Sequence, residues 1–396
     1  MSLALEAAVT LPKTRQAPLK LTLESNLAAI AEEWRALELR STASPYQSFA
    51  FVSTWAAHAG AAEGLTPCVG LVRTPAGLLV GVLPFAIERR AMARVGVYMG
   101  GAHANFSMPL MDHAFQRDVA PSALEGLLRS YCRSSGVDAL YLANQPTTWA
   151  GENHPFLAVG TRQDAPNFGY LTDLPDDLDG FMSQHLSSDR QRKYGRKQRR
   201  LQEAGCQFVG ASGEPEEQRT LLETFFRLKA VQFAAMGVPD PFAEPGAAAF
   251  LTALLGGGKN GHLRLLGLEQ GGAIIAVAGG LRHGDHYTLM LLTFLAEHDL
   301  AKHSPGEYLL VENLRQQHSQ GVRTFDYGAG YAPYKDVWAT QTIQLFDTAL
   351  SHTIAGRAAA GLAGVKRGIV RAIKQRPKLF EMTRRLRGEL LRISGK

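Results

Sequence analysis

Ser304 to Trp338 is the segment whose residue types and spacing are best suited to binding an anion. Its sequence is SPGEYLLVENLRQQHSQGVRTFDYGAGYAPYKDVW. Ser304 is placed as an N-cap, Pro305 suits the first helical position, and Glu307 completes an S-x-x-E capping box. A helix start presents free N–H groups and a partial positive charge, both of which attract anions. The sequence therefore predicts a site for a cofactor phosphate around Ser304 and Gly306.

The rest of this segment predicts a helix, a strand and a sharp bend. Leu310, Val311 and Leu314 recur at helical spacing, and Gly321 is placed to end the helix. The β-prone run 324–327 follows, and two glycines at 328 and 330 then turn the backbone. Such a unit brings a helix N-terminus close to the end of a strand.

The elements around this segment predict a mixed α/β protein. Helices are expected over 21–39, 48–58, 121–134, 214–235 and 246–255, and strands over 68–73, 78–87, 206–211, 286–294 and 343–352. Two turns, TPAG (74–77) and EQGG (269–272), join strands of similar length. SSGVDALYL (134–142) and SQGVRTFDY (319–327) both pass from a helix through Gly-Val into a strand. We therefore expect two similar α/β halves with mixed, largely antiparallel sheets flanked by helices.

The expected organisation has four parts. Residues 1–20 form a flexible leader, 21–185 the N-terminal half, 186–352 the C-terminal half and 353–396 a helical tail. The hydrophobic content of 45% and charged content of 20% are those of an ordinary globular protein. The three cysteines are far apart, which favours a reduced, cytoplasmic setting, and the N-terminus lacks the features of a signal peptide.

Positive charge is concentrated at the C-terminal end. Residues 357–396 hold twelve Lys/Arg and two Glu, so the rest of the chain carries a net charge of −4 although the whole chain is +6. A chain that binds nucleic acid over its whole surface is therefore disfavoured.

Several longer motifs carry a resemblance to a known family. They are SSDRQRKYGRKQRRLQEAG, FFRLKAVQFAAMG, SPGEYLLVENL and FDYGAGYAPYKDVW. Together they resemble the CelD-type branch of the GNAT acyltransferases, whose members are tandem GNAT domains related to the FemAB aminoacyl transferases. The resemblance covers roughly residues 21–352.

The resemblance implies transfer of an acyl group from an acyl thioester, usually acyl-CoA or acetyl-CoA, to an amine. It implies that the pantetheine arm lies along strand 286–294, at Leu291 and Leu292, and that the pyrophosphate lies at Ser304 and Gly306. The usual GNAT phosphate loop is replaced here by LAEHDLAKHSPG, and Pro305 removes one N–H donor. Coenzyme A, acyl carrier protein and aminoacyl-tRNA therefore all stay open as acyl carriers.

Acyl transfer to an amine needs a base for the amine and an acid for the departing thiolate. Asp326 is the candidate base, with a turn role as the alternative. Tyr331 and Tyr334 offer phenols for the thiolate, or pack around Trp338. Lys335 is a candidate for binding a phosphate or another anionic group, and is otherwise a solvated charge.

Three further residues are candidates for contacting the substrate. Arg227 and Gln232 lie on the predicted helix 214–235 and are placed to face the acceptor, and His303 precedes the expected anion site. Surface positions are the alternative for all three. No His/Cys cluster has metal-ligand spacing, and direct attack on a thioester needs no metal.

Two basic segments suggest macromolecular partners. Residues 190–200 hold seven positive side chains and no acid, which suits a phosphate-bearing substrate, acyl carrier protein or RNA, or a solvated linker helix. In the tail, Leu362, Val365, Ile369 and Ile373 recur by three or four with basic residues on the complementary side. A basic amphipathic helix pair hinged at Pro377 suits an anionic membrane surface, with packing on the protein body or on a second copy as the alternative.

Three hypotheses follow. The first is a cytoplasmic tandem-GNAT N-acyltransferase at the inner membrane face, acting on an amine of an envelope lipid, polysaccharide or peptide precursor. The second is a FemAB-like transferase that uses aminoacyl-tRNA. The third is a non-catalytic scaffold. The acyl length and carrier, the acceptor and the oligomeric state are left open by the sequence.

Overall fold

The fold was obtained as a computed structural model that describes residues 19–90, 93–256 and 262–374. Its main sheet has the strand order β12-β13-β14-β15-β16-β11-β17-β8-β6-β5-β2. These strands span β2 Thr66–Pro67, β5 Phe85–Arg90, β6 Ala93–Tyr98, β8 Ala139–Pro146, β11 Thr161–Asp173, β12 Gln207–Val209, β13 Leu263–Gln270, β14 Ala273–His283, β15 His286–Phe294, β16 Thr324–Ala329 and β17 Gln341–Ser351. A second sheet contains β1 Lys20–Glu24, β3 Val69–Arg73, β4 Leu79–Leu83 and β7 Leu110–Met111, and β9 Thr148–Trp149 pairs with β10 Glu152–Asn153.

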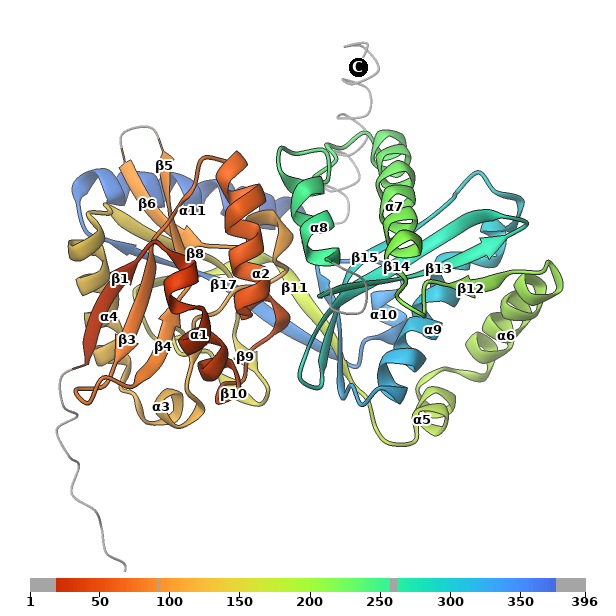
Figure 1. Cartoon of the computed structure of the whole chain (residues 1–396), viewed down its shortest axis with the longest axis horizontal. Coiled ribbons are helices and arrows are strands. Elements are labelled where there is room, and N and C mark those ends of the chain that lie inside the picture. The colour runs from red at the N-terminus through yellow and green to blue at the C-terminus, as the bar shows by residue number, and fades with distance from the viewer. Residues whose placement is uncertain (1–18, 91–92, 257–261, 375–396) are drawn as a thin grey trace, which may run out of the picture.

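Helices lie against these sheets (Figure 1), which confirms the predicted mixed α/β class. They are α1 Ala31–Glu38, α2 Phe49–Trp55, α3 His113–Asp118, α4 Pro121–Ser135, α5 Leu178–His185, α6 Ser188–Glu203, α7 Pro215–Met236, α8 Ala247–Leu255, α9 Pro305–Ser319, α10 Lys335–Trp338 and α11 Ile354–Lys374. In the C-terminal half, successive residues of β13 point to opposite faces. Leu265 packs in the core under α7 and α8, and Leu266 packs in the core under α9.

The predicted repeat is present in the structure. The turns TPAG and EQGG join β3 to β4 and β13 to β14. Helices α4 and α9 both end before a glycine with positive φ, Gly136 at 66° and Gly321 at 90°, and each then enters a strand of the main sheet. Each of these units closes a parallel strand pair, β6 with β8 and β15 with β16.

Both parallel pairs are short and then separate. Strands β15 and β16 pair from His286↔Thr324 to Thr288↔Asp326, the first three residues of each strand. Strands β6 and β8 pair only at Val95↔Ala139 and Gly96↔Leu140. Beyond these residues β15 no longer pairs with β16, and β6 no longer pairs with β8. Each half therefore has a gap between two parallel strands where another group can bind to the backbone.

The two halves exchange strands. Strand β11 precedes residue 185 in the chain yet pairs with β16, and β17 pairs with both β11 and β8. Strand β17 corresponds to the strand predicted over 343–352 in the C-terminal half, and it lies between β11 and β8 inside the continuous sheet. We keep 21–185 and 186–352 as proposed units of the chain that share one sheet.

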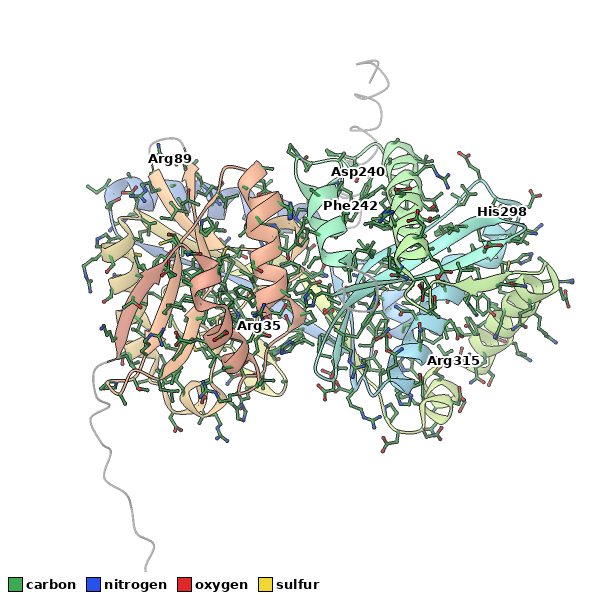
Figure 2. All side chains as sticks on the ribbon, in the orientation of Figure 1. Arg35, Arg89, Asp240, Phe242, His298 and Arg315 are labelled. Carbon is green, nitrogen blue, oxygen red and sulfur yellow. The ribbon has the colours of Figure 1, made fainter. Side chains whose placement is uncertain are left out.

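The apolar core also crosses between the halves. Phe51 of α2 packs edge-on against Phe250 of α8, with ring centroids 5.4 Å apart. Trp149 lies 4.6 Å from His286 of β15. These two contacts fix the N-terminal half against the strands that hold the predicted site. Within the C-terminal half, Phe242, labelled in Figure 2, packs on Phe225 of α7 at 4.9 Å.

The predicted helix over 21–39 is partly wrong. Residues 20–24 form β1, which pairs with β3, because the alternating sequence KLTLE suits a strand at this sheet edge. The helical region begins after Asn26, whose side chain accepts a hydrogen bond from the Ala28 N–H at 3.2 Å. The predicted leader falls almost wholly on residues 1–18, outside the described chain.

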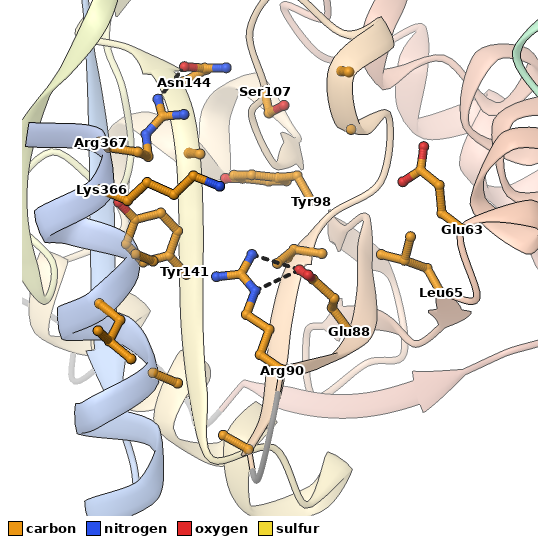
Figure 3. A pocket seen from close by; sticks show the side chains of 18 of the residues that line it. Glu63, Leu65, Glu88, Arg90, Tyr98, Ser107, Tyr141, Asn144, Lys366 and Arg367 are labelled. Atoms are coloured by element: carbon orange, nitrogen blue, oxygen red, sulfur yellow. Dashed lines mark hydrogen bonds and ion pairs between the residues drawn. The ribbon is translucent and has the colours of Figure 1, made fainter. Parts of the chain in front are cut away.

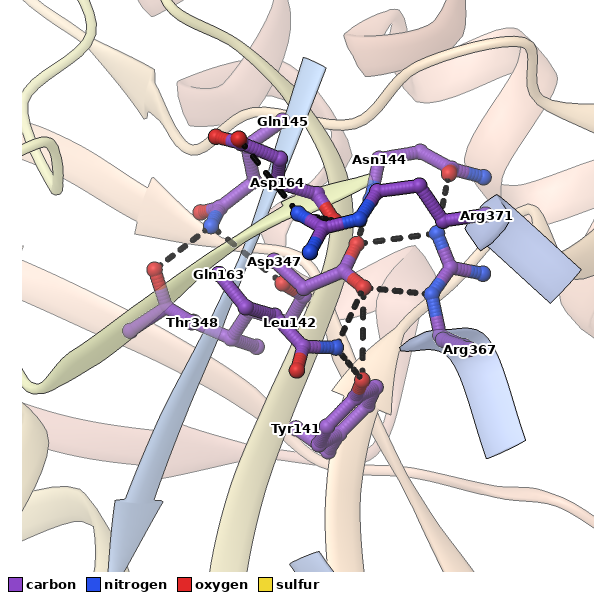
Figure 4. A network of polar contacts seen from close by, with 10 residues as sticks. All are labelled: Tyr141, Leu142, Asn144, Gln145, Gln163, Asp164, Asp347, Thr348, Arg367 and Arg371. Carbon is purple, nitrogen blue, oxygen red and sulfur yellow. Dashed lines mark hydrogen bonds and ion pairs between the residues drawn. The ribbon is translucent and has the colours of Figure 1, made fainter. Parts of the chain in front are cut away.

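Helix α11 is held on the main sheet by a buried carboxylate (Figure 4). Asp347 of β17 is 1% exposed and forms a bidentate ion pair with Arg367. It also accepts hydrogen bonds from the Asn144 N–H at 3.0 Å, the Tyr141 hydroxyl at 3.2 Å and the Gln163 amide at 3.2 Å. Every lone-pair direction of this carboxylate is thus engaged, which is what a buried charge requires.

Candidate functional site

Asp326 lies where β15 and β16 separate. It faces Thr288 in the last paired position of the two strands, and the Thr288 hydroxyl donates to Asp326 Oδ2 at 2.9 Å. The N–H of Gly328 donates to Asp326 Oδ1 at 2.7 Å. The residue is fully buried. The strand register and the following turn therefore orient this carboxyl group through both of its oxygens.

Burial raises the pKa of Asp326 to about 6, and the hydrogen bonds from Gly328 and Thr288 and the charge of Lys335 oppose that rise. The carboxyl group is therefore ionised at neutral pH but is a stronger base than an exposed aspartate. A pKa near the working pH is what general base catalysis favours.

The turn after Asp326 leaves no room for a side chain. Gly328 has φ 79°, and a Cβ at this position would lie 2.7 Å from the Asn105 amide nitrogen. Lys335 is 6% exposed and donates to the carbonyls of Gly328 at 3.1 Å and Ala329 at 3.2 Å. Lys335 was predicted to bind a phosphate or another anionic group, or else to be solvated. In the structure its ammonium group is buried and supports the turn through these two carbonyls.

The N-terminal half reaches the same place. Asn105 donates to the hydroxyl of Tyr46, and Tyr46 is buried between Phe51 and Phe106 at 5.2 and 5.5 Å. Burial raises the pKa of Tyr46, and the charge of Asp326 raises it further. The phenol therefore stays protonated beside the carboxylate.

Tyr46 was not among the predicted site residues. A local signal for its position exists in the S-x-x-Q sequence that starts at Ser44. Ser44 and Gln47 form a capping box that starts the short 3₁₀ helix carrying Tyr46. What the sequence lacks is any sign that this helix start approaches residues 326–328.

The two predicted phenols have different surroundings. Tyr334 is half-buried, its ring lies 6.5 Å from that of Tyr327, and burial followed by the charge of Asp326 raises its pKa. Tyr331 is 70% exposed, and its hydrogen bond with Asp336 raises its pKa. The structure therefore brings Tyr334 into the electrostatic range of Asp326 and gives Tyr331 a partner at the surface.

The predicted capping box at the start of α9 is wrong. Ser304 has φ 56° and ψ 58°, and its side chain makes no capping hydrogen bond. Instead its hydroxyl accepts from Lys197 of α6 at 2.8 Å, and Lys197 lies 3.6 Å from the Glu307 carboxylate. The turn is tight, since a Cβ on Gly306 would lie 3.1 Å from Phe294. Lys197 thus brings a positive charge to the helix start, beside the negative charge of Glu307, and the sequence did not indicate this lysine.

The predicted pantetheine strand is partly occupied by protein contacts. The side chain of Leu291 is 1% exposed in the core. The carbonyl of Leu292 accepts from Lys229 of α7 at 3.0 Å, and Lys229 also donates to Gln232 at 2.9 Å. Burial lowers the pKa of Lys229 to about 8. A pantetheine that pairs with Leu292 must therefore displace this ammonium group.

The remaining predicted contacts lie nearer the surface. Gln232 is held by Lys229, Arg227 is exposed on α7, and His303 is partly exposed in the 3₁₀ helix Asp299–His303 before α9. Among the described residues, none of these three side chains forms a hydrogen bond with Asp326.

A buried histidine at the start of β15 was also missed. His286 packs on Trp149, and burial lowers its pKa to about 3, so the ring is neutral. Its Nε2 has no hydrogen-bond partner among the described residues. Thr288, which donates to Asp326, follows two residues later on the same strand. The neutral ring of His286 is therefore close in sequence to the site around Asp326.

Comparison with known families decides the class of the C-terminal half. Residues 188–336 match the model of the acetyltransferase (GNAT) domain. The chain contains a GNAT acyltransferase domain. This domain holds Asp326, Thr288, Lys335 and the start of α9, so the described site lies within it. No curated protein sequence matches the chain.

The fold around the GNAT domain is shared with solved structures of low sequence identity. The crystal structure of FemX aligns with a TM-score of 0.60 at 11% identity, over 87% of this chain and 99% of that chain. The C-terminal domain of a putative lysylphosphatidylglycerol synthetase from Agrobacterium fabrum gives 0.53 at 13% identity, over 87% and 97%. L-PGS from Bacillus licheniformis gives 0.50 at 9% identity, over 83% and 95%. At these identities the likeness concerns the fold.

Across the described parts of the chain, no three His, Cys, Asp or Glu side chains are grouped to hold a metal ion. Within the same residues, no helix combines the length and the apolar character needed to cross a bilayer.

The raised pKa of Asp326 predicts a pH-dependent stability. Ionisation costs more in the folded protein than in the unfolded chain, so the free energy of unfolding should fall as the pH rises from about 4 to about 6. The total change should be about 2–3 kcal/mol. Asp326→Asn should lack this slope, as measured by urea unfolding at a series of pH values.

The matched control is Asp299→Asn, which alters an exposed aspartate in the same half. Its pH profile should follow that of the unaltered protein. If the free energy of unfolding of Asp326→Asn had the same pH dependence as that of the unaltered protein, Asp326 would not titrate in this range.

Proposed function

We propose that the GNAT domain transfers an acyl group from an acyl thioester to an amine by direct attack, with Asp326 as the base. The supporting observation is the buried carboxyl group at the separating ends of β15 and β16, oriented by Thr288 and Gly328. Thr288 is a positioning residue in this scheme, since it acts through the carboxylate.

The amine nitrogen attacks the thioester carbonyl, the C–N bond forms, and the C–S bond of the tetrahedral intermediate breaks. An alkyl ammonium group has a pKa of about 10, so it first loses one proton to solvent and attacks as the free amine. The nitrogen gives up a second proton as the amide forms, and Asp326 is placed to accept it. The thiolate takes a proton from Tyr334, whose raised pKa keeps the phenol protonated.

Acyl-CoA or acetyl-CoA is the proposed donor. Its phosphates would lie at the start of α9, where the N–H groups of the first helical turn and the ammonium of Lys197, which also contacts Glu307, supply positive potential. The proposed acceptor is an amine of an envelope lipid, polysaccharide or peptide precursor, which rests on the family resemblance alone.

The Asp326–Thr288 contact predicts a shift in the pH dependence of catalysis. Thr288→Val removes a hydrogen bond that favours the ionised carboxylate, so its pKa should rise by about one unit. The acid limb of the rate profile should move to higher pH with little loss at pH 8. Asp326→Asn should lower turnover at least about 100-fold at every pH. Thiol release from acyl-CoA in the presence of a panel of amines measures the rate profile of Thr288→Val and the turnover of Asp326→Asn.

Thr293→Val is the matched control for Thr288→Val. Thr293 is buried on the same strand, and its hydroxyl has no hydrogen-bond partner among the described residues. Its rate profile should therefore be unshifted. Full turnover in both Asp326→Asn and Tyr334→Phe would contradict the assignment of these two residues.

A second candidate function uses an aminoacyl-tRNA as donor. The observation in its favour is α6, whose exposed positions include Arg190, Lys193, Arg196 and Arg199 and whose Lys197 contacts the start of α9. A polyanion bound along α6 would have its end near the proposed phosphate site.

Ligand-dependent thermal stability distinguishes the two donors. Acyl-CoA should raise the melting temperature of the protein because a ligand that binds only the folded state stabilises it. Lys197→Met should reduce this shift. If charged tRNA alone stabilises the protein, with an affinity that falls steeply with salt, the second function holds instead. No shift with acyl-CoA, acyl carrier protein or charged tRNA would favour a non-catalytic scaffold.

The tail has a different orientation from the one predicted. Over residues 354–374 it is packed on the protein body, which was the alternative, and part of its basic side faces the sheet. Arg367 pairs with Asp347, Arg371 lies 3.4 Å from Asp164, and Lys374 donates to Asn167 at 2.8 Å. The predicted hinge at Pro377 and the second helix fall outside the described residues.

The apolar side of α11 is exposed instead. Leu362, Val365 and Ile369 are 73%, 63% and 57% exposed and lie one turn apart. We propose that this row is the part of α11 that contacts a membrane surface, which would place the enzyme on the inner face in the cytoplasm.

Vesicle binding tests this orientation. The full chain should co-sediment with anionic vesicles, and Val365→Ser with Ile369→Ser should lower the bound fraction several-fold because apolar burial is lost. Ala372→Ser, an exposed change on the same helix, should have no effect. Equal binding by the double variant would contradict a role for this row.

A further inference from the structure

A large cavity lies in the N-terminal half, between α11 and the chain that follows α2 (Figure 3). Its volume is about 1110 Å³, slightly more than the roughly 300–1,000 Å³ of typical small-molecule sites. It is bounded by β5, β6 and β8 on one side and by α11 on the other, and Trp55 and Leu65 also line it. None of the residues assigned to the Asp326 site lines it.

The surface of the cavity is mainly apolar. Small side chains of β6, β8 and α11 form its floor: Ala93, Val97, Ala143, Ala355, Ala359 and Ala363. Leu362 contributes to the lining and is also 73% exposed, so it lies at the mouth. A floor of this kind accepts a flexible alkyl chain and offers it no hydrogen bonds.

The charged groups of the lining leave one cation available. Arg90 is paired with Glu88 at 2.6 Å, and Arg367 is paired with Asp347. Lys366 has no hydrogen bond or ion pair with any described residue, and Figure 3 shows its side chain extending into the cavity toward Tyr98. A free ammonium beside an apolar floor is a site for an anionic head group.

The opposite wall carries a carboxylate. Glu63 lies across the cavity from Lys366 (Figure 3) and also has no partner among the described residues. An anionic head group is therefore favoured at Lys366 and disfavoured at Glu63, and the alkyl chain of the ligand lies along the alanine floor.

We propose that this cavity binds a single-chain amphiphile with an anionic head group, held by Lys366 through its charge and by the alanine floor through its chain. The site is separate from the carboxyl site, although one loop lies between them. Gly101, Ala102 and Ser107 line the cavity, while Asn105 of the same loop contacts Tyr46 and the turn at Gly328. A ligand in the cavity thus touches the loop that supports the GNAT domain's carboxyl group.

Calorimetric titration of the full chain tests the proposed amphiphile site. The ligands are alkyl phosphates of eight, ten and twelve carbons, each used below its micelle-forming concentration. Affinity should rise about tenfold for each two methylenes because each buried CH₂ adds a similar increment. Inorganic phosphate alone should bind too weakly to measure. An alkyl trimethylammonium of equal length should bind at least tenfold more weakly than the phosphate.

Variants on α11 locate the binding. Lys366→Met should weaken dodecyl phosphate about tenfold through loss of the charged contact. Arg357→Met, on the same helix but outside the cavity, removes the same charge and should change affinity less than twofold. Ala358→Phe should abolish binding by filling the cavity from an exposed helix position, with unchanged circular dichroism.

Three results would overturn the proposal. They are equal affinity for the phosphate and the trimethylammonium, no dependence on chain length, and equal losses from Lys366→Met and Arg357→Met. Binding that survives Ala358→Phe in a folded protein would place the ligand elsewhere and would also overturn it. Asp326→Asn should bind dodecyl phosphate normally, so failure of the catalytic proposal leaves this test intact.

Discussion

The exchange of β11 and β17 between the halves is the constraint on which the rest of the structure depends. An open sheet edge needs partners for its backbone N–H and C=O groups, and here each half receives its partner from the other part of the chain. Because β11 bonds to both β16 and β17, the halves share one continuous sheet. The N-terminal loop that carries Asn105 is thereby held against the turn at Gly328.

This arrangement explains the electrostatics of Asp326. The side chain is buried because the N-terminal half covers the place where β15 and β16 separate, and burial is the largest influence on its pKa. Two hydrogen bonds and a buried lysine keep the carboxylate from becoming fully neutral at physiological pH. The site therefore combines a raised pKa with a fixed orientation, the two properties that general base catalysis requires.

Helix α11 connects the end of the chain to the opposite half. Its Arg367 satisfies the buried Asp347, its alanine-rich side covers β6 and β8, and its apolar row faces outward. The same placement encloses the cavity that holds Lys366. One helix thus contributes to the stability of the shared sheet, to an exposed apolar surface and to a proposed ligand site.

The sequence by itself determined the local units: α4 with β8 and α9 with β16, each joined through a glycine with positive φ, and the two hairpin turns. These follow from periodicity and from single residues such as Gly136 and Gly321, whose effects reach only a few positions along the chain. Asp326 was proposed in the same way, because it lies in a short β-prone run directly before a glycine turn. The motifs around it also carried the GNAT resemblance, which the family match over 188–336 confirms.

Only the tertiary structure decided how those units meet. Pairing of β1 with β3 replaced a predicted helix start, Lys197 took the hydroxyl of Ser304 away from a capping role, and Lys335 turned inward to the carbonyls of the turn. Tyr46 joined the site from a segment 280 residues away in the chain. Each of these outcomes rests on hydrogen bonds and burial between distant segments, and such contacts leave no periodic or local signal in a single sequence.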